Sequence, residues 1–137
     1  MRNLVLLLGL LAGLAFLPAN AQESRSESIE STISGQIDAF LADDFARAFT
    51  YASPMIRGIF QTPETFGQMV RQGYPMVWRP SDVRFLDLED LGGRMLQRVQ
   101  ILDQAGVRYI AEYEMIRTED GWQINGVRIE RSPEVGA

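Results

Sequence analysis

The chain has 137 residues and a formal net charge of −5 at pH 7, which is enough material for one domain. The acidic balance argues against binding to nucleic acid, whose phosphates need a basic surface, and against binding to anionic lipid. The sequence contains no histidine, cysteine or lysine. Without histidine it lacks the commonest general base and metal ligand, without cysteine it cannot form disulfides, and without lysine it cannot form a Schiff base. Any catalysis would therefore rest on carboxylates, hydroxyls or tyrosines.

The first segment has the pattern of a secretory signal peptide. Met1 and Arg2 form a short positive start, residues 4–17 are apolar, and residues 19–21 form the small-x-small site that signal peptidase cleaves. The apolar run is shorter than the roughly 18 residues of a membrane-spanning helix. We therefore expect cleavage after Ala21 and a mature chain without a membrane segment; an uncleaved amino-terminal anchor is the alternative. A secreted chain without disulfides suits the bacterial periplasm, so the predicted location is periplasmic or secreted.

The mature chain is predicted to form one domain. Residues 22–27 are polar and predict a flexible tether, residues 28–131 form the domain, and residues 132–137 form a tail. Ser28 is placed to cap the first helix. Apolar residues then recur every three or four positions as far as Leu41, which is typical of an amphipathic helix.

Three further helices are predicted, each with a local start signal. Asp43-Asp44 precedes a helix over about residues 45–52. Ser53-Pro54 and Thr62-Pro63 each combine a hydroxyl cap with proline at the first helical position. The last of these helices stops at Gly73, which can adopt the left-handed conformation that closes a helix.

From Asp82 onward the apolar period changes to two, which predicts strands. Four strands are expected, at about residues 83–88, 94–102, 107–115 and 122–129. Within the last strand the alternation reverses at Asn125-Gly126, which predicts a β-bulge. Amino-terminal helices followed by a four-stranded antiparallel meander are typical of the α+β class, in which helices cover one face of the sheet.

The mature chain resembles a known family along nearly all of its length. The resemblance lies in AFxADDxxxAFxxASPxIRxxF (39–60), TPExFxxMVRxGYPxVxRP (62–80), VRFLDL (83–88), YEM (113–115) and WxIxGxRI (122–129). These segments are similar to the bacterial proteins grouped as domain-of-unknown-function family 4864, and through them to the nuclear-transport-factor-2-like superfamily. The resemblance implies a cystatin-like cone, in which a curved sheet wraps around helices and encloses a cavity. It implies no activity, and the absence of histidine departs from the acid–base mechanism of the superfamily's isomerases and dehydratases.

Aromatic and arginine side chains concentrate at the junction between the helices and the sheet, from Thr62 to Asp87 and shortly before it. Arginine binds carboxylates through its planar fork, and tryptophan offers a cation–π face. We expect a small anionic or amphipathic ligand to be bound by Tyr51, Arg57, Arg71, Tyr74, Trp78 and Arg79. The alternative is that Tyr74 and Trp78 fill the cone while the arginines pair with surface acids.

Two groups of carboxylates are candidates for acid–base chemistry. Asp43-Asp44 could exchange a proton, or could cap a helix, as aspartate before a helix commonly does. Glu112 and Glu114 share one face of the third strand and could act as acid and base, or could bind a hard cation together with Asp87. They could instead pair across the strands with Arg98, Arg108 or Arg128.

The sequence favours a non-catalytic periplasmic module that binds a small ligand or another protein. One alternative is a homodimer, or docking on another envelope protein, through the open face of the sheet. Another is a lyase or isomerase that uses tyrosine and a carboxylate. No cofactor and no metal site is predicted, because the chain has none of the zinc, phosphate-loop or dinucleotide-binding motifs.

Overall fold

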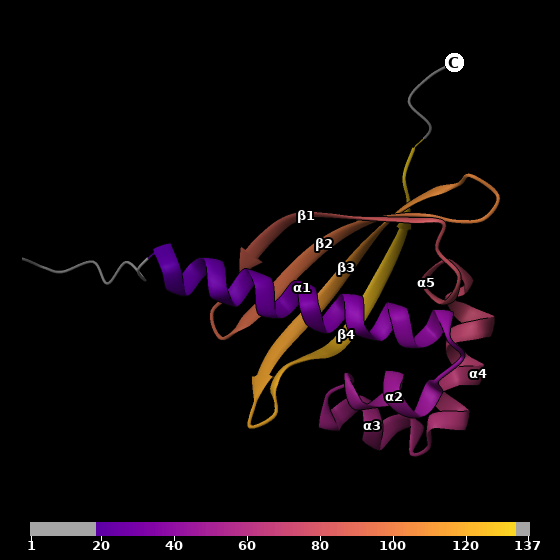
Figure 1. Ribbon diagram of the computed structural model, residues 1–137, viewed down its shortest axis with the longest axis horizontal. Coiled ribbons are helices and arrows are strands. Elements are labelled where there is room, and N and C mark those ends of the chain that lie inside the picture. The colour runs from indigo at the N-terminus through magenta and orange to yellow at the C-terminus, as the bar shows by residue number, and fades with distance from the viewer. Residues whose placement is uncertain (1–18, 134–137) are drawn as a thin grey trace, which may run out of the picture.

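The computed structural model describes residues 19–133, in which helices precede a four-stranded sheet (Figure 1). The helices are α1 (Ala19–Leu41), α2 (Phe45–Thr50), α3 (Pro54–Phe60), α4 (Pro63–Gly73) and α5 (Pro75–Trp78). The strands are β1 (Asp82–Asp90), β2 (Arg94–Leu102), β3 (Arg108–Thr118) and β4 (Gly121–Arg131). Most of the predicted signal peptide and the end of the predicted tail lie outside the described residues.

Helix α1 begins earlier than the sequence predicts. It is continuous from Ala19, so the expected tether at residues 22–27 is helical and Ser28 lies inside the helix rather than at its start. Alanine, glutamine, glutamate and arginine in this stretch are good helix formers, and Arg25 also forms an ion pair with Asp90 at 3.6 Å. Within residues 19–133, no helix is both long and apolar enough to cross a membrane.

The next three helices start where the sequence predicts. The side chains of Asp44, Ser53 and Thr62 each accept a hydrogen bond, at 3.1 to 3.3 Å, from the backbone amide three residues later. The end of α4 differs, because Gly73 is its last residue and does not adopt positive φ. Tyr74 ends the helix instead, with φ of −134° and ψ of 51°, and the proline that follows it disfavours the helical conformation at this position. Helix α5 follows directly, in a stretch for which no helix is predicted from the sequence.

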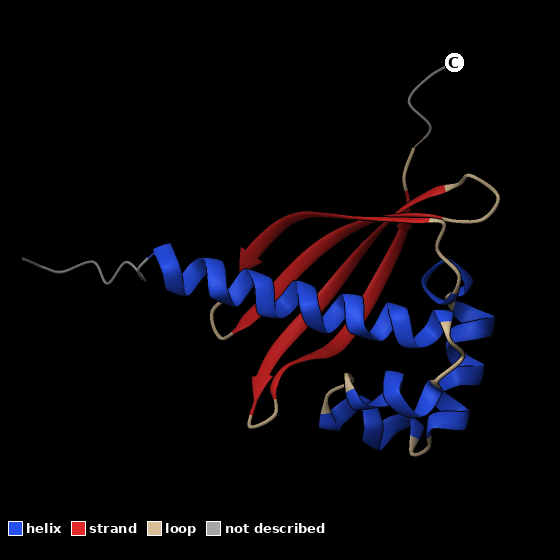
Figure 2. Cartoon of the chain, in the orientation of Figure 1, coloured by secondary structure: helices blue, strands red, loops and turns tan. Residues whose placement is uncertain are grey.

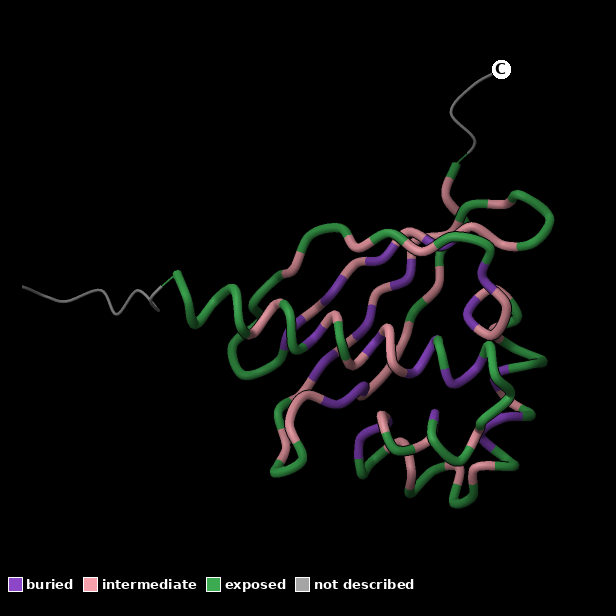
Figure 3. Tube along the Cα trace, viewed as in Figure 1, coloured by how far each residue is buried: buried purple, intermediate pink, exposed green. Residues whose placement is uncertain are grey.

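The four strands pair antiparallel in the order β1-β2-β3-β4. Helix α1 crosses the inner face of the curved sheet, and α2 to α5 gather at one end of α1 (Figures 1 and 2). Buried and part-exposed residues alternate along β2 and β3, as the period of two predicts (Figure 3). The inner face contributes Met95, Val99, Ile101, Ala111, Tyr113 and Met115 to a core that it shares with Ile29, Ile33, Ile37 and Phe40 of α1.

The predicted bulge in β4 is confirmed. Glu114 pairs with Gly126 while Met115 pairs with Ile124, so Asn125 is the extra residue. A second irregularity lies in β1 between Phe85 and Leu88, and the sequence analysis does not predict it.

The outer face of the sheet carries a network of ion pairs. Arg98 pairs with Asp87, Glu89 and Glu112, and Arg128 pairs with Glu112 at 3.4 Å. Of the hypotheses for Glu112 and Glu114, the structure shows ion pairing with arginines on neighbouring strands. Because these side chains lie on a partly exposed face, each pair contributes little to stability.

Candidate functional site

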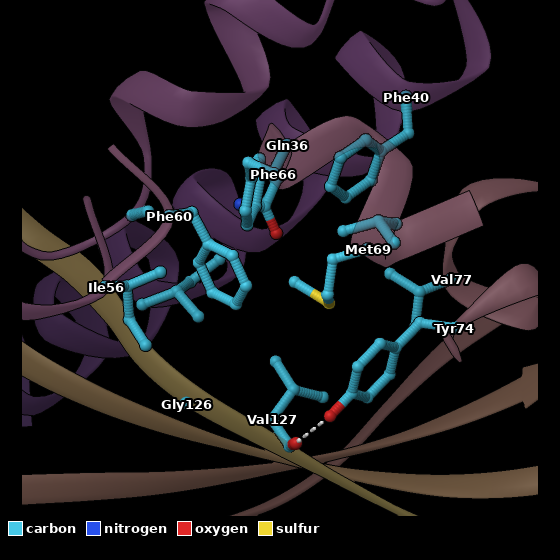
Figure 4. A pocket seen from close by; sticks show the side chains of 13 residues that line it. Gln36, Phe40, Ile56, Phe60, Phe66, Met69, Tyr74, Val77, Gly126 and Val127 are labelled. Atoms are coloured by element: carbon cyan, nitrogen blue, oxygen red, sulfur yellow. Dashed lines mark hydrogen bonds between the residues drawn. The ribbon is translucent and has the colours of Figure 1, made fainter. Parts of the chain in front are cut away.

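A cavity of about 220 Å³ lies between the carboxyl-terminal half of α1, helices α3 and α4, and β4 (Figure 4). Its lining consists of Gln36, Phe40, Ala52, Ile56, Phe60, Phe66, Met69, Val70, Tyr74, Val77, Ile124, Gly126 and Val127. No charged side chain is among these described lining residues. The site is therefore an apolar cavity with two polar side chains, Gln36 and Tyr74.

Phe66 of α4 organises one wall of the cavity. Its ring centroid lies 5.9 Å from that of Phe40, 5.4 Å from that of Phe49 and 5.8 Å from that of Phe60, in tilted pairs. Such tilted geometry is favourable for aromatic rings. Met69, one turn further along α4, extends from this wall toward the centre of the cavity (Figure 4).

Strand β4 positions helix α3 at the other side. As an edge strand it has free backbone groups, and Ile124 donates its N–H to Tyr51 and accepts from the N–H of Ser53, at 2.9 and 2.8 Å. Ser53 Oγ, which caps α3, donates to Oδ1 of the bulged Asn125 at 2.8 Å. Asn125 Nδ2 in turn donates to Glu114 Oε1 at 3.1 Å. The bulge therefore links the start of α3 to the outer face of the sheet.

The two polar side chains of the cavity make hydrogen bonds to the main chain. Gln36 is 4% exposed and donates from Nε2 to the carbonyl oxygen of Ala48 at 3.2 Å. Tyr74 donates from its hydroxyl to the carbonyl oxygen of Val127 at 3.4 Å. Neither side chain carries a charge, so the site has no built-in means of binding an ion.

The six residues predicted to hold a ligand do not come together. Of these six, Tyr74 alone lines the apolar cavity, whereas Tyr51 and Arg57 lie at a separate shallow pocket beside Trp122. The guanidinium of Arg71 lies 5.0 Å from the centroid of the Phe45 ring on the outside of α4.

Trp78 and Arg79 instead clamp the end of α1. Both donate to Asp43 Oδ1, from Trp78 Nε1 at 2.9 Å and from Arg79 Nη2 at 2.8 Å. Arg79 Nη1 also donates to the carbonyl oxygen of Phe40 at 2.6 Å, and its guanidinium stacks 4.2 Å from the Trp78 ring. We call these three residues, Asp43, Trp78 and Arg79, the α1 clamp.

The α1 clamp explains the roles of the paired aspartates. The hydrogen bond from Trp78 and then that from Arg79 hold the pKa of Asp43 below its usual value. Asp43 is therefore ionised at neutral pH and engaged in structure, while Asp44 caps α2. Neither aspartate lines the cavity, so the structure favours a structural role over proton transfer for this pair.

Replacing Asp43 with asparagine should reveal the clamp as a pH-dependent contribution to stability. Because the pKa of Asp43 is lowered by folding, its carboxylate stabilises the fold above about pH 3.8 and loses this effect as pH falls through the folded-state pKa. Urea unfolding should show Asp43→Asn less stable than wild type at pH 6, with a smaller difference at pH 3. Asp82→Asn, at an exposed position, is the control; a deficit of Asp43→Asn that is equally large at pH 3 would contradict this account.

Gln36 is a polar lining residue that is not predicted from the sequence. It lies on the apolar stripe of α1 between Ile33 and Phe40, and a polar residue within such a stripe is a usable signal. Phe60 and Phe66 could not be assigned to a cavity in advance, because apolar helix positions look the same whether they pack fully or line a void. Among residues 19–133, no group of three acidic side chains is placed to hold a metal ion, so Asp87, Glu112 and Glu114 do not form the cation site considered for them.

Comparison of the sequence with known protein families identifies one that matches most of the chain. The family model described as "Domain of unknown function (DUF4864)" matches residues 22–137. No curated protein matches the chain significantly.

Solved structures show the same fold. An NTF2-like protein of unknown function from Shewanella baltica OS155 is similar at a TM-score of 0.57 and 14% identity, over 86% of this chain and 100% of that one. A protein of the NTF2-like family from Streptomyces avermitilis, provisionally called a dehydratase, is similar at a TM-score of 0.54 and 13% identity, over 80% of this chain and 97% of that one. The α+β cone is thus an NTF2-like fold, and the chain belongs to the DUF4864 family.

Proposed function

We propose that this protein binds a small, largely apolar molecule in the cavity beneath α3 and α4 and does not transform it. The observation that carries the proposal is the cavity itself, about 220 Å³ with an almost wholly apolar lining. Protein interiors are close-packed, and voids larger than a water molecule are few. The pocket is partly open to solvent, and a concave site with an apolar lining is the usual form of a small-molecule binding site.

The size and chemistry of the cavity define the class of ligand. An apolar cavity of about 150 Å³ remains dry and binds benzene. The larger volume here fits one aromatic ring with a short alkyl substituent. Removing such a molecule from water contributes about 25 cal/mol per Å² of apolar surface buried.

Helix α3 provides the cover over the cavity. Ile56 and Phe60 line the cavity from this helix, while Met55 and Ile59 are 53% and 62% exposed on its other side. None of its residues is fully buried. A cover held by so few buried side chains can open locally at low cost and admit a ligand without disturbing the sheet.

The lining favours binding over catalysis. The Streptomyces avermitilis relative is provisionally called a dehydratase, and dehydration requires a general acid or base. The described residues around this cavity include no carboxylate, and the sequence contains no histidine. Among the described lining residues Tyr74 alone carries a hydroxyl, and this hydroxyl donates a hydrogen bond to the carbonyl oxygen of Val127. These groups do not make an acid–base pair, which supports a binding role.

Ethylbenzene is the probe for this proposal. Titration into the wild-type protein should raise the melting temperature in a saturable manner, because a ligand that binds only the folded state stabilises it. Met69→Trp should abolish the shift, since the larger side chain occupies the cavity where Met69 now extends into it. Met55→Trp makes the same change at an exposed position of α3 and should leave the shift intact.

Two outcomes would overturn the proposal. One is a wild-type protein that shows no shift with ethylbenzene up to its solubility limit. The other is a shift of equal size in Met69→Trp. Val127→Phe, which fills the same cavity from β4, is a second filling variant in case Met69→Trp disturbs α4.

A further inference from the structure

We infer that the ligand is neutral and carries a hydrogen-bond donor, such as a phenolic hydroxyl or a ring N–H, which it gives to Oε1 of Gln36. This inference rests on the proposed function and specifies its chemistry. It departs from the anionic ligand that the sequence suggests, because the arginines that would hold an anion do not line the cavity.

The orientation of the Gln36 amide follows from its partner. The carbonyl oxygen of Ala48 can only accept, so the amide nitrogen of Gln36 must be the atom that faces it, at 3.2 Å. The amide oxygen then points the other way, toward the centre of the cavity (Figure 4). Among the described residues, none donates a hydrogen bond to this oxygen. Gln36, which is 4% exposed as a whole residue, thus presents at the wall of the partly open pocket an acceptor that no described residue pairs with and that water in the pocket can reach.

The unpaired oxygen of Gln36 sets a chemical requirement for a ligand that displaces water from the pocket. Such a ligand covers this oxygen, and burying a polar group without a hydrogen bond is unfavourable. A ligand with a hydrogen-bond donor avoids that cost, whereas a hydrocarbon ligand does not. Tyr74 does not meet this need, because its hydroxyl proton is directed to the carbonyl oxygen of Val127. Once a ligand has displaced water from the pocket, the donor must therefore come from that ligand.

The same geometry selects against anions. A carboxylate placed here would face an amide oxygen, another acceptor, and would lose its water without gaining a cation. Of the arginines predicted to bind an anion, Arg57 lies at a separate pocket and Arg79 in the α1 clamp. A compound with the same ring but an ionised substituent is therefore expected to bind far more weakly than the neutral donor.

The test is a cycle of two ligands and two proteins. Dissociation constants of 4-ethylphenol and ethylbenzene are measured for wild type and for Gln36→Met, which keeps the length of the side chain but removes the acceptor. The preference for 4-ethylphenol should be about tenfold larger in wild type than in the variant, since one hydrogen bond of this kind is worth about a factor of ten. 4-Ethylbenzoate should bind wild type at least tenfold more weakly than 4-ethylphenol.

A direct readout on the wild-type protein covers the case in which Gln36→Met folds poorly. The side-chain amide resonances of Gln36 should shift when 4-ethylphenol is added and shift much less with ethylbenzene. The inference is wrong if the preference is the same in both proteins, if these resonances respond equally to both ligands, or if 4-ethylbenzoate binds as tightly as 4-ethylphenol. Binding of ethylbenzene alongside any of these results would leave the proposed function standing, whereas no binding of either neutral ligand would overturn both.

Discussion

Phe66→Ala should lower the free energy of unfolding by about 3–5 kcal/mol, the typical cost of removing a buried phenylalanine from a core. Phe66 is 5% exposed and its ring lies against those of Phe40, Phe49 and Phe60. The substitution removes these contacts and also enlarges a cavity that is already present. Few neighbouring side chains can then move in to fill the space that the ring leaves. Urea unfolding followed by circular dichroism measures the change.

The control for this substitution is Ile59→Ala on α3, where the side chain is 62% exposed. That change should stay within about 0.5 kcal/mol, as is usual for surface positions. A cost below about 1.5 kcal/mol for Phe66→Ala would show that the aromatic wall relaxes around the deletion. In that case the cavity would be more plastic than its packing suggests.

Tyr113→Phe should raise the free energy of unfolding by about 1–3 kcal/mol. The side chain of Tyr113 is fully buried on the inner face of β3, and its hydroxyl has no hydrogen-bond partner among the described residues. Gln97, which lies opposite it on β2, is also fully buried, and its Oε1 likewise lacks a partner in residues 19–133. Removing the hydroxyl abolishes its desolvation cost and leaves the ring packing unchanged.

The pH dependence of stability gives an independent measurement on the same residue. Burial raises the pKa of Tyr113 above its ordinary value of 10.0. The unfolded chain therefore releases this proton at about pH 10 while the folded chain keeps it, so stability falls as pH rises above 10, by up to about 1.4 kcal/mol per pH unit. Tyr113→Phe should lose this part of the slope. Destabilisation by Tyr113→Phe at pH 7 would instead mean that an internal water joins the hydroxyl to Gln97.

Much of the fold is predictable because its signals are local. Ser53-Pro54 and Thr62-Pro63 place helix starts within a single turn of chain, and Asn125-Gly126 locates the bulge by a change of parity in one strand. The start of α1 is predicted wrongly because residues 22–27 carry no apolar stripe, which is the signal that predicts an amphipathic helix. Polar residues 22–27 have good helix propensity, and they continue a helix whose stable part lies further on.

The candidate site is far less predictable, because it is assembled from segments distant in sequence. Gln36 and Val127 come from opposite ends of the domain and meet at one cavity. The aromatic and arginine residues at the junction predict a binding site from their residue types alone. In the structure, Trp78 and Arg79 instead donate hydrogen bonds to Asp43. Residue type indicates what a side chain can bind, but its partner is decided by tertiary packing.

The α1 clamp also determines how the molecule can open. By joining Asp43 to Arg79 it closes the intervening stretch of chain, which includes α2, α3 and α4, into a loop with both ends held at one point. In a chain without cysteine, this closure is non-covalent and restricts the freedom of the loop ends only while the hydrogen bonds of the clamp are formed. Within this loop, Tyr51 and Ser53 are also held to Ile124 of β4 by backbone hydrogen bonds, so the loop has a third fixed point. Exchange of a molecule with the pocket would thus depend on local opening of α3 between these fixed points and not on unfolding of the sheet.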